Sequence, residues 1–293
     1  MRLSVAMIVK NESSCLAKCL ETVKDADEII ICDTGSEDNT IEIAKKYTDK
    51  VFTDYKWNDN FAEARNHALS KATGDWILTI DADEELLDPI SGVKKVATDA
   101  EARGIKAVNF SQISGNSSNK SPRLYKRCPE VYWVGAIHNH LSIGTKVDSD
   151  LRVRYGYSEA HKKDPDRSLR ILKKEVEKGG KVRELYYLAR EYWYRKDYIT
   201  AIYWWDEYLA VSKFLSEKAD AYLMVAKCYW ALRKGDNARL YCVNALTINS
   251  NFKEALLFMA TMSREISAKG WRKYAEIADN EDVIFIRNAK KTV

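Results

Sequence analysis

The sequence predicts an α/β front half followed by an all-helical back half. Short apolar runs alternate with helical patterns over residues 1–90, which is typical of a sheet covered by helices. After residue 164 the pattern is helical throughout, and one segment recurs in similar form. The length of 293 residues fits about two domains.

Four apolar runs predict strands of one core sheet. They are LSVAMIV (3–9), EIIIC (28–32), VFTDY (51–55) and WILTI (76–80). Continuous apolar strands separated by helices predict a mostly parallel sheet with both faces buried. The first run is too short to span a bilayer and charged residues follow it, so we expect a cytoplasmic protein.

Three helices are expected between these strands. The first carries Leu16, Leu20 and Val23 on one face, with Ser13 as its expected cap. The second has Ile41, Ala44 and Tyr47 at helical spacing, and the third is FAEARNHALSKATG, which we expect to close at Gly74.

Residues 105–160 have a different character, with short β-like pieces joined by polar turns. The pieces are AVNFSQIS, SPRLYKR, EVYWVGAIHNHLSI and DLRVRYGYS. We expect them to add antiparallel strands to the same sheet.

The back half contains an internal repeat. Residues 221–246 align with 184–209 at an offset of 37, and a third copy begins at FKEALLFMA (252–260), offset by 34 from the second. Small residues match where two helices would cross, as at Ala189/Ala226 and Ala201/Ala238. A period near 34 resembles tetratricopeptide repeats, which stack into a concave superhelix. In such repeats we expect Trp193, Trp204, Trp205 and Trp230 to lie in the core or the groove.

The distribution of charge and the spacing of the cysteines indicate which ligands and structural sites the chain suits. Residues 1–150 hold 19 Lys and Arg against 24 Asp and Glu, a net charge of −5, whereas residues 151–293 hold 28 against 19, a net charge of +9. The acidic half suits a cation, and the basic half suits either an acidic partner or a solvated helical surface. The six cysteines form no C-x-x-C pair, which argues against a zinc site or a disulfide framework.

The stretch GDWILTIDADEEL (74–86) ends a buried strand in four carboxylates: Asp81, Asp83, Glu84 and Glu85. Like charges this close repel, and a bound cation would offset the repulsion. Residues two apart in an extended strand point the same way, so Asp81 and Asp83 are expected to face one cleft. Carboxylates suit Mg²⁺ and Mn²⁺.

Asp33 ends another predicted strand, before Thr34-Gly35-Ser36. This residue pattern makes a turn or a helix cap, and it also suits a carboxylate that accepts a hydrogen bond from a base or ribose. The two interpretations are compatible. In parallel sheets, ligands bind beyond the carboxyl ends of the strands, where both clusters lie.

Four segments, taken in order, resemble the family 2 glycosyltransferases: SVAMIVKNE, IICDTGSEDNT, FAEARNHALSKATGDWILTIDADEEL and VYWVGAIHNHL. The similarity is to small bacterial and phage members with a C-terminal tetratricopeptide-like region, including relatives of the peptide S-glycosyltransferases. The resemblance implies a GT-A catalytic domain over residues 1–163 and a helical domain over 164–293. It also implies a nucleotide-sugar donor, with UDP as the nucleotide, and Mn²⁺ or Mg²⁺ as cofactor.

The same resemblance assigns roles to individual residues. Asp83 is the expected direct metal ligand, with Asp81 and His138 nearby, and His138 also lies near the reacting centre. The residues expected to bind the nucleotide sugar are Val9, Asn11, Glu12, Asp33, Arg65, Asn66, Asp81 and Ala82.

The sequence departs from the family pattern at one position, because Asn139 follows His138 where the family has glutamate. Asparagine cannot act as a base, so the base that takes the acceptor proton is open. Either His140, Glu85 or Asp148 substitutes as the base, or the acceptor is acidic enough to need little help. Because the base is open, it also stays open whether the sugar is transferred with inversion or with retention of configuration.

The acceptor is also open. A peptide or protein suits a tetratricopeptide-like groove, hydroxymethylated phage DNA would suit the basic half, and a surface glycan is a third possibility. The residues expected to contact DNA phosphates are Lys162, Lys163, Arg167, Arg170, Lys173 and Lys174, which would otherwise be one solvated helix face. The alternative from another class is a non-catalytic adaptor whose front domain has lost activity. P-loop and Rossmann motifs are absent, and the adjacent His138-Asn139-His140 does not make a nuclease site.

Overall fold

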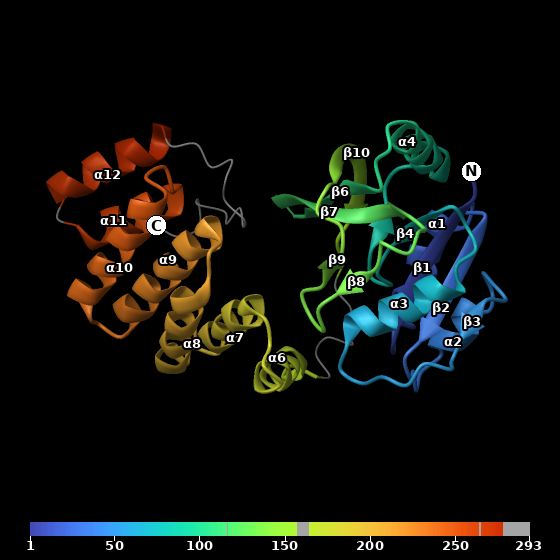
Figure 1. The fold of residues 1–293 in the computed structure, drawn as a ribbon, viewed down its shortest axis with the longest axis horizontal. Helices are drawn as coiled ribbons and strands as arrows, with labels where there is room; N and C mark the ends of the chain where they lie inside the picture. The colour runs from blue at the N-terminus through green and yellow to red at the C-terminus, as the bar shows by residue number, and fades with distance from the viewer. Residues whose placement is uncertain (116, 157–163, 264, 278–293) are drawn as a thin grey trace. The chain divides into compact units, whose positions relative to one another are not determined.

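The computed structural model describes residues 1–115, 117–156, 164–263 and 265–277. The chain divides into two compact units, Met1–Arg167 and Ser168–Val293. The first unit is α/β and the second is helical, which confirms the predicted fold class (Figure 1). It remains a prediction that residues 1–163 are a catalytic domain and that residues 164–293 are a domain of tetratricopeptide-like repeats.

The first unit contains an eight-stranded sheet with the order β3-β2-β1-β4-β7-β6-β10-β5. Its strands are β1 (Leu3–Val9), β2 (Glu28–Asp33), β3 (Val51–Phe52), β4 (Trp76–Thr79), β5 (Glu85–Leu86), β6 (Ala107–Ser114), β7 (Ser117–Lys126) and β10 (Val147–Arg154). Strands β3, β2, β1 and β4 run parallel, as their continuous apolar sequences predict. The carboxyl ends of β1, β2 and β4 therefore meet at one edge of the sheet.

The later strands make the sheet mixed. Strand β7 runs antiparallel to both β4 and β6, as predicted, whereas β10 runs parallel to β6 and antiparallel to β5. The segment VYWVGAIHNHL departs from the prediction, because β8 (Trp133–Val134) and β9 (His140–Leu141) form a separate two-stranded sheet. The Asn66 side chain hydrogen-bonds to both the N–H and the C=O of Trp133 and so holds β8.

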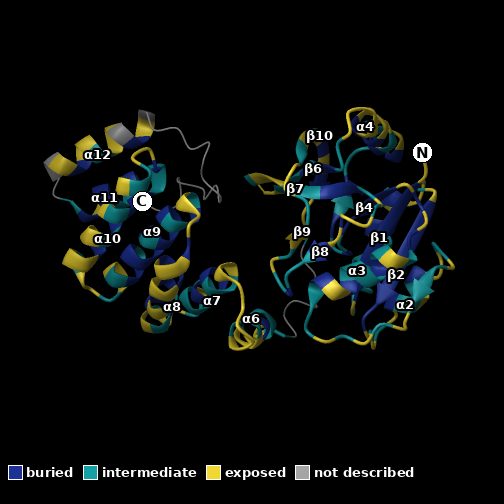
Figure 2. Cartoon of the chain, in the orientation of Figure 1, coloured by how far each residue is buried: buried dark blue, intermediate teal, exposed yellow. Residues whose placement is uncertain are grey.

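Four helices of this unit cover the sheet: α1 (Leu16–Val23), α2 (Thr40–Ala44), α3 (Phe61–Lys71) and α4 (Ile90–Ala102). Buried side chains of α1 and α4 pack with one face of the strands, and those of α3 pack with the other. Figure 2 shows the parallel strands β1, β2 and β4 as buried. The sheet is thus covered on both faces, as the sequence predicts.

Two predicted helix ends are wrong. Helix α1 has Cys15, and not Ser13, at its N-cap position. Helix α3 ends at Lys71, because Ala72 is already extended, so Gly74 does not close it. Gly74 is required for a different reason: a Cβ there would lie 2.6 Å from Ser4 Oγ and 2.8 Å from Ser4 N, which leaves no room for a side chain.

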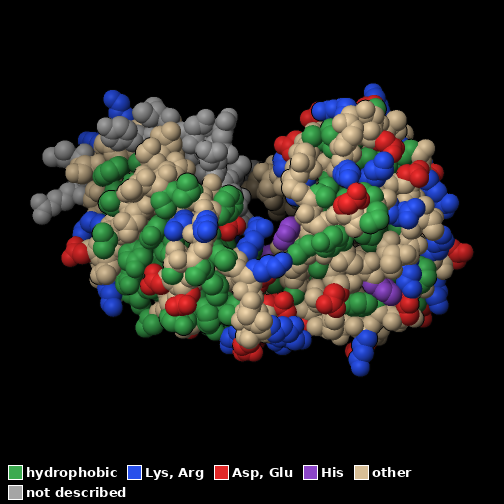
Figure 3. Space-filling view, in the orientation of Figure 1, with side chains coloured by type: hydrophobic (Ala, Val, Ile, Leu, Met, Phe, Trp, Pro, Cys, Tyr) green, Lys and Arg blue, Asp and Glu red, His purple; other side chains and the backbone are tan. Residues whose placement is uncertain are grey.

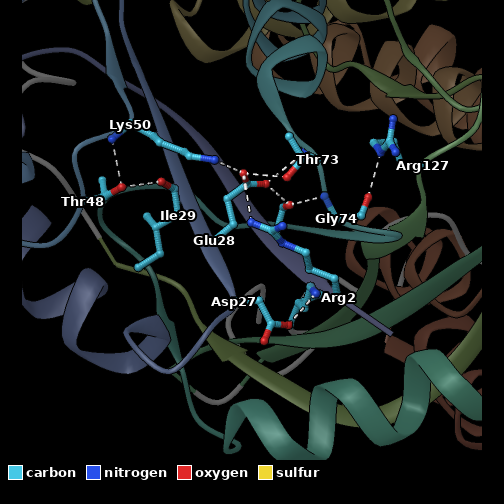
Figure 4. A network of polar contacts seen from close by, with 11 residues as sticks. Arg2, Asp27, Glu28, Ile29, Thr48, Lys50, Thr73, Gly74 and Arg127 are labelled. Atoms are coloured by element: carbon cyan, nitrogen blue, oxygen red, sulfur yellow. Dashed lines mark hydrogen bonds and ion pairs between the residues drawn. The ribbon is translucent and has the colours of Figure 1, made fainter.

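A buried carboxylate ties together the amino ends of the strands, away from their carboxyl ends. Glu28 opens β2, and its side chain is 1% exposed. It accepts hydrogen bonds from Ser4 Oγ, from Lys50 Nζ, and from Thr73 N and Oγ1 at 2.8 and 2.9 Å (Figure 4). These contacts link β1, β2 and the segment before β4, so they fix the strands that form the parallel part of the sheet.

The second part of the chain is a series of antiparallel helix pairs. Its helices are α6 (Arg167–Glu177), α7 (Val182–Tyr194), α8 (Tyr198–Val211), α9 (Leu215–Ala231), α10 (Gly235–Ile248), α11 (Lys253–Met262) and α12 (Glu265–Ile277). Helices pair as α7 with α8, α9 with α10 and α11 with α12. The predicted crossing residues Ala189, Ala226, Ala201 and Ala238 are all fully buried.

The turns inside the first two pairs confirm the repeat offset. Lys196 and Arg233 both have a left-handed backbone, with φ of 61° and 59°. They lie 37 residues apart, which is the offset found in the sequence. The same chain reversal therefore recurs at equivalent positions.

The surface of the helical unit is rich in apolar side chains. Of the 13 exposed large hydrophobic residues in the described part of the chain, ten lie between Val182 and Val243. Figure 3 shows hydrophobic side chains gathered on the visible face of this unit. Trp205 is fully buried, whereas Trp230 is 41% exposed, so the tryptophans divide between core and surface. Among the described residues, no helix combines the length and apolar character needed to cross a membrane.

Candidate functional site

A cleft of about 250 Å³ opens at the carboxyl ends of β1, β2 and β4. Its lining residues are Ile8, Val9, Lys10, Asn11, Glu12, Thr34, Trp57, Phe61, Arg65, Asp81, Ala82, Asp83, Tyr155, Asp164 and Arg167. Seven of them were expected from the sequence to bind donor or metal: Val9, Asn11, Glu12, Arg65, Asp81, Ala82 and Asp83. These seven residues lie up to 74 positions apart in the chain, from Val9 to Asp83, and they line one cavity.

The loop after β1 forms one wall and is held by the loop after β2. The Asn11 backbone is left-handed (φ 57°), and its N–H donates to Ser36 Oγ at 2.9 Å. Asn11 Oδ1 in turn accepts from the Glu37 N–H at 2.8 Å, and the Glu12 N–H donates to Thr40 Oγ1 at 2.7 Å. Asn11 therefore shapes the cleft wall through its own backbone and amide oxygen.

Asp33 makes the turn predicted for it, and it is not among the residues that line the cleft. Its Oδ2 accepts from the N–H groups of Gly35 and Ser36, both at 2.9 Å, which makes the predicted turn. Gly35 has φ of 107°, a conformation that favours glycine. Asp33 Oδ1 is buried and has no hydrogen-bond partner in the described part of the chain. A buried acceptor without a donor is costly, so this oxygen is suited to a ligand N–H or O–H.

Asp81 is held by two arginines. Arg65 Nη2 donates to Asp81 Oδ1 at 2.9 Å, and Arg123 Nη1 lies 3.6 Å from Asp81 Oδ2. Burial alone would raise the pKa of Asp81, but the two guanidinium groups hold that pKa below its ordinary value. The arginines therefore offset much of the repulsion that the sequence assigned to a cation.

The carboxylate segment forms a turn and not an extended strand. Strand β4 ends at Thr79, and the Glu84 N–H donates to Asp81 O at 3.0 Å. The expectation that Asp81 and Asp83 share a strand face is therefore wrong. Both residues still line the cleft. Gly156 packs directly on this turn, since a Cβ there would lie 1.7 Å from Asp83 O.

Glu84 is a buried residue whose role the sequence analysis missed. Its side chain is fully buried and accepts from Arg123 Nη2 at 2.5 Å, Gln112 Nε2 at 3.0 Å and the Asp81 N–H at 3.0 Å. Burial, followed by the nearby charge of Asp81, raises the pKa of Glu84. No local sequence pattern marked this burial, because Glu84 lies in a turn whose partners Arg123 and Gln112 are distant in the chain.

The three-residue metal set Asp81, Asp83 and His138 is not assembled. In the described part of the chain, no three or more His, Cys, Asp or Glu side chains come together as a metal site. His138 is exposed, with φ of 48°, and does not line the cleft. A cation bound by one or two protein carboxylates, with water and phosphate oxygens as its other ligands, remains compatible with Asp83.

The other predicted residues lie outside the cleft lining. Asn66 Nδ2 donates to Trp133 O at 2.9 Å and its Oδ1 accepts from the Trp133 N–H at 2.8 Å, so its amide holds β8. Glu85 pairs with Lys18 and Arg154 at 2.7 and 3.1 Å; the Lys18 hydrogen bond is the largest influence that lowers its pKa. His140 is exposed on β9, and Asp148 accepts from Asn109 at 2.8 Å.

Aromatic side chains form the remaining wall. Trp57 and Phe61 meet edge to face with ring centroids 4.9 Å apart, and both line the cleft. Arg167 lies over the Phe61 ring at 5.2 Å, and Arg65 lies over the Trp133 ring at 5.1 Å. These stacking contacts restrain both guanidinium groups at the cleft.

Residues 4–146 match the family model described as glycosyl transferase family 2. A TPR repeat-containing protein of Synechococcus elongatus is 38% identical over 141 residues, which are 47% of this chain and 34% of that protein. The SPbeta prophage-derived glycosyltransferase SunS of Bacillus subtilis is 33% identical over 142 residues, 46% of this chain and 34% of that protein. The aligned part of the chain thus spans about one third of each relative.

The solved structure of S. aureus TarS 1-349 in complex with UDP is a distant likeness. It is 14% identical with a TM-score of 0.44, over 82% of this chain and 90% of that chain. The mixed sheet and the family match agree with the GT-A fold class expected from the sequence.

Proposed function

Because residues 4–146 match the family model described as glycosyl transferase family 2, we propose that the protein transfers a sugar from a nucleotide-sugar donor, with UDP as the nucleotide. The observation that supports this most is the assembly of seven predicted residues in one cleft at the carboxyl ends of parallel strands. A cleft of this kind, mostly preformed and with a few converging polar groups, is the usual form of a small-molecule site.

Two buried polar atoms support a nucleotide ligand. Asp33 Oδ1 is an acceptor that suits an N–H of a base or a ribose hydroxyl. Arg65 Nε is a donor with no acceptor in the described part of the chain, and Arg65 lines the cleft, where a phosphate oxygen would satisfy it. We assign Asp33 to the nucleoside and Arg65 to the diphosphate.

Asp83 is the residue we assign to Mn²⁺ or Mg²⁺, together with the phosphate oxygens of the donor. A bound divalent cation would neutralise the negative charge that grows on the leaving diphosphate. Asp83 lines the cleft, and Asp81 is already engaged by Arg65 at 2.9 Å and by Arg123 at 3.6 Å. Metal dependence is therefore expected to reside in Asp83 more than in Asp81.

The acceptor base is better sought within the cleft than among His138, His140 and Glu85. Asp164 lines the cleft and carries a carboxylate, which is a competent general base when it lies near the acceptor hydroxyl or thiol. Glu85 is engaged in two ion pairs outside the lining. We therefore assign the base to Asp164 and retain His138 as the alternative that the family resemblance favours.

We propose a peptide or protein as the acceptor. The paired helices resemble tetratricopeptide repeats, whose surfaces hold polypeptide segments, and the exposed apolar side chains of the helical unit suit such a ligand. For the DNA alternative, Lys162 and Lys163 lie outside the described residues. Arg167 and Lys173 each lie over an aromatic ring, at 5.2 and 5.6 Å, which favours a structural use of these cations. A cytoplasmic location remains a prediction.

A non-catalytic adaptor is the second candidate, favoured by Asn139 and by the position of both neighbouring histidines outside the cleft. The release of UDP from UDP-sugars with Mn²⁺ present, by the unaltered chain and by Asp83→Ala, separates the two. Release that depends on Mn²⁺ and is lost in the variant supports the enzyme. Binding without any turnover, with or without peptide acceptors, supports the adaptor.

A further inference from the structure

Arg123 contacts the carboxylates of Asp81 and Glu84, although it does not itself line the cleft. Its side chain is 9% exposed, and its two terminal nitrogens are divided between Asp81 and Glu84. Glu84 in turn accepts from the backbone of Asp81. Arg123 therefore contacts both ends of the turn that carries Asp83.

A β-bulge delivers Arg123 to this position. On the β6–β7 ladder, Leu124 is paired with Val108 and Pro122 with Asn109, which leaves Arg123 as the extra residue. A bulge bends its strand and re-aims a side chain, and proline within a strand is tolerated at such a site. The departure from regular pairing thus occurs at the residue that reaches the carboxylates.

The four side chains form a set of balanced charge. Arg65 and Arg123 are each within 4 Å of Asp81, on different carboxylate oxygens, while Glu84 pairs with Arg123. Burying two charge pairs is costly, and apolar residues of similar size often give equal or greater stability. A requirement for stability alone therefore explains this arrangement poorly, whereas a requirement for fixed geometry explains it well.

We propose that Arg123 is a positioning residue of the donor site. It fixes the 81–84 turn through Asp81 and Glu84, so that Asp83 meets the cation and the donor phosphates in one geometry. Asp81 is thereby reserved for the arginines. This inference rests on the proposed function, because it needs a nucleotide and a cation in the cleft.

The double substitution Arg123→Met with Glu84→Gln tests the inference without leaving a charge buried alone. Methionine fills the space of the arginine stem, and glutamine can still accept from the Asp81 N–H. One charge of each sign is removed, so the net charge is unchanged. Arg127→Met is the matched control, because Arg127 immediately follows β7 and donates from Nε to Gly74 O at 2.7 Å, away from the cleft.

The measurement is the affinity for UDP by titration calorimetry, with and without Mn²⁺. For the double variant we expect the Mn²⁺-dependent gain in affinity to fall by about tenfold, as for other changes to groups that orient a metal ligand. Affinity without Mn²⁺ should stay near that of the unaltered protein, and Arg127→Met should change neither value. Arg123→Lys keeps the pair with Glu84 but lacks the planar fork, so it should lose part of the gain.

Three results would overturn the inference. In the first, the double variant retains the full Mn²⁺-dependent gain in UDP affinity. In the second, it loses UDP affinity equally with and without Mn²⁺. In the third, Arg127→Met loses as much of the Mn²⁺-dependent gain as the double variant. If the double variant does not fold, Arg123→Lys becomes the test. A partial loss of the Mn²⁺-dependent gain in UDP affinity supports the inference, and no loss overturns it. Absence of any UDP binding by the unaltered protein would instead contradict the proposed function, and the inference with it.

Discussion

Arg65 and Asp81 are joined at 2.9 Å across the floor of the cleft, from a helix and from the end of a strand. Helix α3 presents Arg65 one residue before Asn66, whose amide holds the neighbouring β8 backbone. Arg65 therefore acts on the charge of Asp81, whereas Asn66 holds the backbone of β8.

Arg65→Met should weaken both the fold and the donor site. Asp81 would lose its shorter ion pair, and loss of one partner of a largely buried pair costs about 2 kcal/mol or more in the free energy of unfolding. UDP affinity should fall as well, since Arg65 lines the cleft. Urea unfolding and calorimetry measure the two effects. Lys71→Met, on the same helix but paired with Asp54 outside the cleft, is the control. Unchanged UDP affinity in Arg65→Met would remove Arg65 from the donor site.

Asn66→Asp should destabilise β8 without a direct effect on the nucleotide. The substitution removes the donor to Trp133 O and brings a carboxylate toward that carbonyl oxygen. An unsatisfied or repelled buried group of this kind costs about 1–3 kcal/mol. We expect a lower unfolding temperature and faster amide hydrogen exchange at Trp133 and Leu141. A variant with normal stability but weaker UDP binding would show instead that Asn66 acts on the ligand.

Gly74→Ala should be strongly destabilising, because its Cβ would lie 2.6 Å from Ser4 Oγ and 2.8 Å from the Ser4 backbone. Backbone must move to relieve this contact, and overpacking of this kind costs about 1–3 kcal/mol. Gly144→Ala is the matched control, since no atom lies within 4 Å of its added Cβ. Thermal unfolding of both variants gives the comparison. Equal stability of the two would contradict the close packing at Gly74.

Glu28 predicts a specific dependence of stability on pH. Burial alone would raise its pKa, but hydrogen bonds from Lys50, Ser4 and Thr73 lower it from 4.5 to about 2. The depressed pKa means that the stabilisation is fully present above pH 4.5 and is lost as pH falls toward 2. The shift corresponds to roughly 3 kcal/mol.

Denaturant unfolding between pH 7 and pH 2 tests this, with Glu28→Gln as the variant. The stability difference between the unaltered protein and Glu28→Gln should be largest near pH 7 and should shrink below pH 4.5. Glu101→Gln is the control, because Glu101 forms an exposed pair with Lys126. A difference that stays constant with pH would show that Glu28 stabilises the fold by packing and not by charge.

The parts of the fold that depend on local periodicity could be predicted from the sequence. Strands β1, β2 and β4 could be predicted from their own apolar residues. Ala189 and Ala226 could be predicted to lie at helix crossings because they recur at equivalent positions of the repeat. Cleft-lining residues that follow predicted strands, such as Asp81 and Asp83, could also be predicted from their positions at strand ends. Their partners could not be predicted, because Arg123 is 42 residues from Asp81 and reaches it through a bulge that no local pattern announces.

Other misses have similar causes. Gly74 was assigned to a helix end because glycine is common there, whereas its role is set by Ser4, a distant neighbour in the chain. Asn66 looked like a ligand contact from its motif, and only the structure shows both of its amide atoms bonded to Trp133. Asp164 had no motif to mark it, and its place in the cleft lining depends on the path of the chain after β10.

The most direct test of the central claim is thermal unfolding with UDP, GDP, CDP and TDP, each with and without Mn²⁺. It would be run on the unaltered protein and on Asp83→Asn. A ligand at about 100 times its dissociation constant adds about 2.7 kcal/mol to the free energy of unfolding. We expect a shift for UDP that requires Mn²⁺ and is lost in Asp83→Asn. No shift with any nucleotide, or an equal shift in the variant, would contradict a metal-dependent nucleotide-sugar site in this cleft.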